Sequence, residues 1–222
     1  MATPTIPNGE EHFFPIIYSG NGQGQRVGKF VPFTDDGTIV NSCIFDEASS
    51  AYLSKTFSSD GNKQTFTFSM WMKRCNIGSR MDFISFRQDV PMYIKADNTL
   101  VVALFGDISR NTNRTFEDTS KFYHILLSVD SRESTANDRI KLYIDGEQIT
   151  SFSTTNNPSQ DEEANIYTVS REFYLGNIIG GSYYTDAYFS EVNYIDGQAL
   201  TPASFGVTDT STGRWIPKTV VP

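Results

Sequence analysis

Two acidic side chains, Glu191 and Asp196, lie near each other in an alternating apolar stretch that ends in an Asp-Gly turn. Two carboxyl groups about 5 Å apart form the catalytic pair of retaining glycosidases. Side chains alternate between the two faces of a strand, so a regular strand over 188–195 places Glu191, Asn193 and Ile195 on one face. Asp196 then has the opposite parity and lies in the turn. The spacing disfavours a glycoside hydrolase, and we expect no enzyme and no catalytic residue.

A second candidate for chemistry is a glycine-rich segment that carries two adjacent tyrosines, Tyr183 and Tyr184. Exposed aromatic rings stack on sugars, while a few carboxylate or amide groups orient the ligand by hydrogen bonds. Asn177 and Asp186 flank the tyrosines and supply those groups. The segment therefore predicts a glycan-binding loop built from these four residues. The alternative is that one ring packs inward while the other covers the edge of a sheet.

Metal and cofactor chemistry has little support in the composition. The chain has two cysteines, Cys43 and Cys75, and two histidines, with no spacing typical of a zinc site. We expect both thiols to be free and buried, and a disulfide between them is the open alternative. Asp107 and Asp186 are candidates for a calcium site in rim loops, but ordinary loop aspartates are the favoured interpretation. No glycine loop that cradles phosphate is recognisable, so we expect no metal site and no cofactor.

The charge of the chain excludes two classes of partner. Its 222 residues carry a formal net charge of −8, with a pI of about 4.7 and no basic cluster. Phosphate backbones and anionic lipid surfaces need concentrated lysine and arginine, so we expect no nucleic acid partner. No apolar run approaches the roughly 20 residues of a membrane-spanning helix, so we expect no membrane insertion. The N-terminal sequence also lacks the basic head and apolar stretch of a secretory signal.

Short alternating segments dominate the chain from about residue 38 onward. The clearest is 65–73, where the even-numbered residues are apolar. Asp97-Asn98 and Asp145-Gly146 are typical hairpin turns, and His124 is expected to be a packed side chain rather than a general base. Further strands are expected over 83–87, 92–96, 99–105, 122–130, 139–144, 148–152, 172–176 and 188–195, and polar loops over 106–120, 131–138 and 153–168. This pattern, without helix-period stretches, predicts an all-β, antiparallel β-sandwich.

The two ends of the chain differ from this pattern. Residues 1–40 hold four prolines and several glycines, and we expect an extended N-terminal arm there, with the sandwich over 41–222. The segment 12–18 is too apolar to be left in water, so it packs either on its own sheet or on another subunit. The C-terminal tail from residue 215 is also apolar and proline-rich. The expected subunit contacts are Phe13, Phe14, Ile16, Ile17, Tyr18 and Trp215.

Three motifs together resemble the laminin-G-like, concanavalin A-like family of sandwiches. They are the strand that begins Phe122-Tyr-His-Ile, the hairpin Lys141-Leu-Tyr-Ile-Asp-Gly146, and the late strand Ser190-Glu-Val-Asn193, in that order. The resemblance covers about residues 63–218. It implies a jelly-roll β-sandwich.

Two longer blocks, 195–206 and 212–218, are more specific. They are similar to a version of this fold that is common in structural proteins of marine bacteriophages. The resemblance implies a non-catalytic virion protein, either a capsid decoration protein or a component of a fibre or appendage. Its partners would be other virion proteins and copies of itself, with a homotrimer as the expected oligomer. The alternative is a receptor-binding adhesin that recognises host-surface polysaccharide, and a β-sandwich glycoside hydrolase is a weaker second alternative.

Overall fold

The computed structural model describes residues 39, 41–86, 89–166, 171–177 and 183–218. Apart from Ile39, the predicted N-terminal arm lies outside these residues. The strands are β1 (Cys43–Phe45), β2 (Leu53–Thr56), β3 (Thr65–Arg74), β4 (Met81–Phe86), β5 (Asp89–Ile94), β6 (Thr99–Val102), β7 (Arg110–Thr115), β8 (Tyr123–Asp130), β9 (Ile140–Ile144), β10 (Glu147–Gln148), β11 (Phe152–Thr155), β12 (Glu172–Leu175), β13 (Ala187–Asp196), β14 (Gly206–Thr208) and β15 (Trp215–Pro217), with two 3-10 turns, η1 (Ala136–Asp138) and η2 (Pro202–Ser204).

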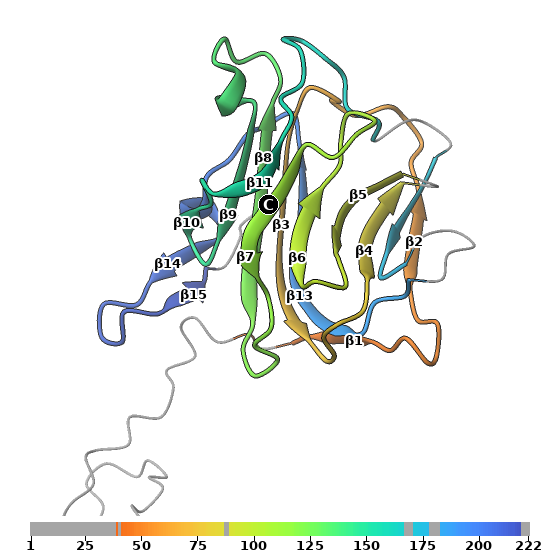
Figure 1. Cartoon of the computed structure of the whole chain (residues 1–222), viewed down its shortest axis with the longest axis vertical. Coiled ribbons are helices and arrows are strands. Elements are labelled where there is room, and N and C mark those ends of the chain that lie inside the picture. The colour runs from red at the N-terminus through yellow and green to blue at the C-terminus, as the bar shows by residue number, and fades with distance from the viewer. Residues whose placement is uncertain (1–38, 40, 87–88, 167–170, 178–182, 219–222) are drawn as a thin grey trace, which may run out of the picture. The chain divides into compact units, whose positions relative to one another are not determined.

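Two antiparallel sheets form the two layers of the domain (Figure 1). The six-stranded sheet has the order β1-β13-β3-β8-β9-β10, and the seven-stranded sheet has the order β11-β7-β6-β5-β4-β12-β2. A third, two-stranded sheet pairs β14 with β15. The prediction of an all-β antiparallel sandwich is therefore confirmed, and the arrangement is consistent with a jelly roll. Among the described residues, no helix has the length and apolar character needed to cross a membrane.

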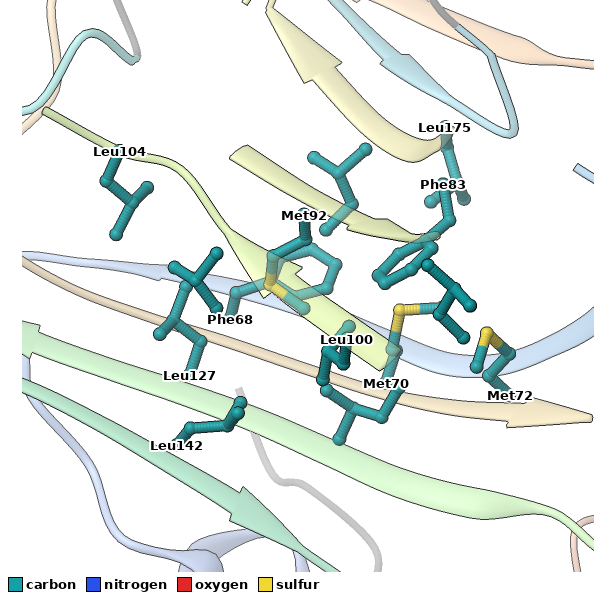
Figure 2. Packing of buried hydrophobic residues seen from close by; sticks show 14 of the residues in the cluster. Phe68, Met70, Met72, Phe83, Met92, Leu100, Leu104, Leu127, Leu142 and Leu175 are labelled. Carbon is teal, nitrogen blue, oxygen red and sulfur yellow. The ribbon is translucent and has the colours of Figure 1, made fainter. Parts of the chain in front are cut away.

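The core lies between the two large sheets and follows from strand alternation. In β3 the even-numbered side chains Phe66, Phe68, Met70 and Met72 all face the other sheet and are at most 3% exposed. They meet apolar side chains from β4, β5 and β6, and Figure 2 shows Phe68, Met70 and Met72 beside Phe83, Met92 and Leu100. The period-two pattern of β3 therefore predicted the correct inward face.

Strand β7 corrects the predicted polar loop over 106–120. Its sequence, Arg-Asn-Thr-Asn-Arg-Thr, lacks apolar side chains, yet it pairs with both β6 and β11. The side chain of Arg110 is 2% exposed, and its guanidinium donates hydrogen bonds to the carbonyl oxygens of Ser109 and Asn156 and to Oδ1 of Asn157, at 2.6–3.1 Å. Backbone and amide oxygens thus satisfy this buried cation, which the sequence pattern could not predict.

Residues 197–218 run along the outer face of the six-stranded sheet, the face turned away from the core, and we call them the C-terminal strap. The Thr67 hydroxyl donates to the carbonyl oxygen of Gln198 and accepts from the amide of Leu200, both at 2.7 Å. Farther along, Trp215 of β15 contacts the same sheet. The strap explains why the outward-facing residues of β3 are also buried. The blocks 195–206 and 212–218 therefore have a structural role in this fold.

His124 lies beneath the strap and is fully buried. The indole Nε1 of Trp215 lies 3.0 Å from its Nδ1, and the hydroxyl of Ser69 lies 2.9 Å from its Nε2. Because an indole N–H can only donate, Nδ1 must be the acceptor, and the ring proton is on Nε2. Burial lowers the pKa of His124 to about 4, opposed by the charge of Asp145. The expectation of a packed histidine is confirmed.

The cysteines correct one expectation. Both Cys43 and Cys75 are free, but both are exposed rather than buried. Strand β13 lies between β1, which carries Cys43, and β3, after which Cys75 follows. Two strand spacings amount to about 9 Å, which exceeds the reach of a disulfide. The fold therefore keeps the two thiols apart.

Candidate glycan-binding site

A cluster of charged and aromatic side chains on the outer face of the seven-stranded sheet forms the candidate site. The guanidinium of Arg80, just before β4, lies 4.2 Å from the ring centroid of Tyr93 in β5 and 4.6 Å from that of Tyr183. We call these three side chains the Arg80 stack. Cation–π contacts with two rings restrict the rotamers of the arginine and of both tyrosines. The stack is therefore a rigid surface that presents an aromatic ring.

The backbone holds Tyr183 in this position. The amide of Asp82 donates to the carbonyl oxygen of Tyr183 at 3.1 Å, and the Thr185 hydroxyl donates to the carbonyl oxygen of Asp82 at 3.0 Å. The amide of Thr185 also donates to the carbonyl oxygen of Gly176 at 2.9 Å, which holds residues 183–185 at the end of β12. These bonds attach the tyrosine to two strands of the sheet. The residue nevertheless remains 45% exposed.

A buried carboxylate anchors the arginine. Asp82 shares the outer face with Tyr93, because the two residues are register partners in β4 and β5. Its side chain is fully buried and accepts from Nε and Nη2 of Arg80 at 2.7 and 3.2 Å. Burial raises the pKa of Asp82, against the opposing effect of Arg80. Burial also opposes the charge on Arg80, but the bonds to Asp82 outweigh it and raise the pKa of the guanidinium.

A pocket of about 310 Å³ adjoins the Arg80 stack and shares two of its residues. Its volume is at the lower end of the range for small-molecule sites. Asp89 is paired with Arg171 at 2.7 Å, and Asp107 accepts a hydrogen bond from the amide of Ile108 at 2.8 Å. The lining residues are Arg80, Asp89, Val90, Tyr93, Ala103, Leu104, Gly106, Asp107, Ile108 and Asn165. We call this the Arg80 pocket.

The arrangement suits the recognition of a polyhydroxylated ligand. Two carboxylates can accept hydrogen bonds from hydroxyl groups, and the amide of Asn165 can both donate and accept. The exposed ring of Tyr183 offers a flat apolar face beside them. The lining therefore combines apolar side chains with convergent polar groups that can fix the orientation of a ligand.

The structure places only one of the four predicted glycan-binding residues in this site. Tyr183 belongs to the Arg80 stack, whereas Tyr184 and Asp186 are half-buried in the segment that precedes β13. Burial, followed by the charge of Asp46, raises the pKa of Asp186. Asn177 is 3% exposed, and its side-chain oxygen is buried without a partner among the described residues. Asn177 thus lies below the surface and outside the Arg80 stack, and its bonding to a sugar stays a prediction.

Sequence analysis missed Arg80, Asp82 and Tyr93. One signal was present, since Arg80 and Asp82 are two residues apart at the start of an apolar strand and so share a face. Two charges at such positions in a buried strand indicate an ion pair. The contribution of Tyr93 depends on the register of β4 with β5, which the sequence did not specify.

The acidic pair at Glu191 and Asp196 has a different geometry from the one predicted. Strand β13 contains a bulge, because its register with β3 shifts between Ser190 and Asn193. Glu191 lies in this bulge with a φ of +47°. The extra residue reverses the alternation beyond it, so Glu191 does not share the face of Asn193 and Ile195, which pair with Ser69 and Thr67 and do share a face as predicted. Asp196 accepts a hydrogen bond from the backbone amide of Asn62 at 2.7 Å, which gives it a role in holding a loop.

The remaining predicted residues lie elsewhere. Asp107 lines the Arg80 pocket, while Asp186 precedes β13. Within the described ranges, no group of three or more histidine, cysteine, aspartate or glutamate side chains could hold a metal ion. Trp215 packs on its own sheet, and a contact of its exposed part with another subunit stays a prediction. The predicted subunit contacts Phe13, Phe14, Ile16, Ile17 and Tyr18 lie outside the described residues.

Comparison with known proteins identifies the family to which the chain belongs. A family model for the concanavalin A-like lectin/glucanases superfamily matches residues 46–204. No curated protein sequence matches the chain significantly.

Several solved structures are similar at low identity. Domain 4 of AbnA, an extracellular GH43 arabinanase from Geobacillus stearothermophilus solved with arabinotriose, is 19% identical with a TM-score of 0.47, covering 76% of each chain. A heptameric SAP-like pentraxin from Limulus polyphemus is 16% identical with a TM-score of 0.47, covering 75% of each chain. A sialidase from Trypanosoma rangeli is 14% identical with a TM-score of 0.44. The match covers 63% of this chain but only 21% of the sialidase.

Proposed function

Because the chain belongs to the concanavalin A-like lectin/glucanases superfamily over residues 46–204, we propose that it is a carbohydrate-binding domain that acts without catalysis. The observation that carries the proposal is the Arg80 stack, with Tyr183 exposed beside a pocket that contains carboxylate and amide groups. The recognition of host-surface polysaccharide by an adhesin is one setting in which such a domain would act.

The rigidity of the stack supports binding. Ordering a side chain on binding costs about 0.5–1.5 kcal/mol, and a ring that is already fixed avoids that cost. Two strands and the buried Asp82 hold Tyr183 and Arg80 before any ligand arrives. A sugar that stacks on the ring therefore meets a preorganised surface.

A glycan microarray of bacterial polysaccharide fragments tests the proposal. Wild type should bind at least one glycan, and Tyr183→Ala should weaken that binding at least about tenfold. Tyr188→Ala is the matched control, because Tyr188 lies on the outer face of the other sheet. Equal binding by wild type and Tyr183→Ala would show that the glycan does not bind at the Arg80 stack. Release of reducing sugar by wild type would contradict a non-catalytic role.

The virion context is a separate proposal. It is supported by the resemblance of 195–206 and 212–218 to segments of marine phage structural proteins, and it implies location in the virion, association with other virion proteins and a homo-oligomer, with a trimer expected. Mass spectrometry of purified particles, followed by cryo-electron microscopy, tests it. The protein should be present in the particles, and its absence from them would remove the virion proposal while leaving the glycan proposal intact.

A further inference from the structure

We propose that the Arg80 pocket selects neutral glycans over glycans that carry a carboxylate, phosphate or sulfate group. This inference rests on the proposed function and specifies its ligand class. It follows from how the charged side chains in and around the pocket are already paired. Arg80, Asp89 and Asp107 are the charged residues among those that line it.

Arg80 is the one cation that lines the pocket in the part of the chain that the structure describes, and it is already paired with a counterion. Nε and Nη2 of Arg80 both bond to Asp82, and the rings of Tyr93 and Tyr183 cover the guanidinium. Asp82 occupies the side-on fork of Nε and Nη2 and leaves the two N–H groups of Nη1 and the second N–H of Nη2, which can donate to a hydroxyl or a ring oxygen. An anion could bond only to this remaining end of a guanidinium whose charge Asp82 already balances.

Displacing the counterion is unfavourable. Asp82 is fully buried, so an anionic ligand that took over Arg80 would leave a buried carboxylate without its partner. Removing one member of a buried ion pair is strongly destabilising, because the other charge cannot be rehydrated. An anion can therefore bind only in addition to Asp82.

The other charges near the pocket also disfavour an anion. Asp89 and Asp107 both line it, and like charges brought together at an interface lose affinity. Arg171 is not a lining residue and is paired with Asp89 at 2.7 Å. Hydroxyl groups, in contrast, can donate to both carboxylates. The lining therefore matches a neutral sugar better than an acidic one.

The test uses matched pairs of oligosaccharides that differ only in oxidation of the C6 hydroxymethyl group to a carboxylate, or in a single sulfate. Wild-type protein should bind the neutral member at least about tenfold more tightly, measured by titration calorimetry. Equal or tighter binding of the acidic member would overturn the inference. Failure to bind any glycan would instead remove the proposed function itself.

A charge variant separates the role of Asp82 from general repulsion by the acidic chain. Asp82→Asn keeps the shape and removes the charge, so the preference for the neutral member should narrow several-fold. Asp138→Asn removes an equal charge from a partly exposed side chain that is paired with Lys141, and the preference of this variant should match that of wild type. An unchanged preference in folded Asp82→Asn would contradict the role assigned to the pair.

A second measurement needs no variant. Binding of the acidic member by wild type should not weaken between about 0.05 and about 0.5 M NaCl, because salt screens its repulsion by Asp89 and Asp107. A steep loss of affinity for the acidic member as salt rises would indicate an attractive contact with Arg80 and would overturn the inference even if Asp82→Asn does not fold.

Discussion

The indole of Trp215 and the imidazole of His124 are hydrogen-bonded at 3.0 Å across the outer face of the six-stranded sheet. The two rings are also stacked, with centroids 5.9 Å apart. Residue 215 is near the end of the chain, whereas residue 124 is in a central strand. This contact fastens the C-terminal strap to the sandwich.

We expect Trp215→Phe to lower the free energy of unfolding by about 1–3 kcal/mol, because Nδ1 of His124 would lose its donor while remaining buried. Chemical denaturation followed by circular dichroism measures the loss. A change of less than about 0.5 kcal/mol would mean that the strap contributes little to stability.

The buried histidine should make the fold sensitive to acid. The pKa of His124 is about 4 in the folded protein, below its ordinary value of 6.5. Between these values the unfolded chain binds more protons than the folded chain, so stability falls as the pH decreases from about 6.5 to about 4. The loss attributable to this residue is about 3 kcal/mol. His124→Gln should be less stable at neutral pH, but its free energy of unfolding should depend less on pH between about 6.5 and about 4. An unchanged slope in this variant would contradict the assignment of the acid sensitivity to His124.

Gly206 should tolerate no side chain. A Cβ atom at this position would overlap the indole ring of Trp215, and only a shift of the ring could relieve the overlap. We expect Gly206→Ala to lower the free energy of unfolding by about 1–3 kcal/mol and to shift the tryptophan fluorescence. Val207→Ala is the control, because Val207 is exposed in the same strand. Equal stability of the two variants would argue against the close packing of β14 on the indole.

The two thiols should behave as separate, accessible groups. A maleimide should label both Cys43 and Cys75 without denaturant, because both are exposed. Burial, followed by the charge of Asp186, raises the pKa of Cys75, so its labelling at pH 7–8 should be slower than that of a free cysteine. Mild oxidation should give no disulfide between the two, and its detection by peptide mapping would contradict the position of β13 between them.

Strand alternation and turn residues predicted much of the sandwich. The apolar face of β3 and the hairpin turn at Asp145-Gly146, with φ values of +54° and +84°, follow from local sequence alone. Strand β7 was missed because tertiary contacts bury Arg110 in a segment with no apolar side chain.

The site was less predictable than the fold. Tyr183 could be singled out because a tyrosine in a glycine-rich segment is a local signal in the sequence, and its binding to a sugar stays a prediction. The bulge at Glu191 reversed the expected faces of β13, and one extra residue in a strand leaves no clear pattern in the sequence. Tyr93 joins the stack only through the pairing of β4 with β5, a relationship between residues distant in the sequence.

The most direct test of glycan recognition is an NMR titration of the ¹⁵N-labelled protein with a neutral oligosaccharide that it binds, observing the Nε–H signal of Arg80. This proton is in the hydrogen bond to Asp82 and beside the rings of Tyr93 and Tyr183. We predict that the signal shifts in a saturable way, with the affinity measured by calorimetry, and that Tyr183→Ala abolishes the shift. Saturable shifts confined to other parts of the domain, with the Arg80 signal unchanged, would contradict binding at this site.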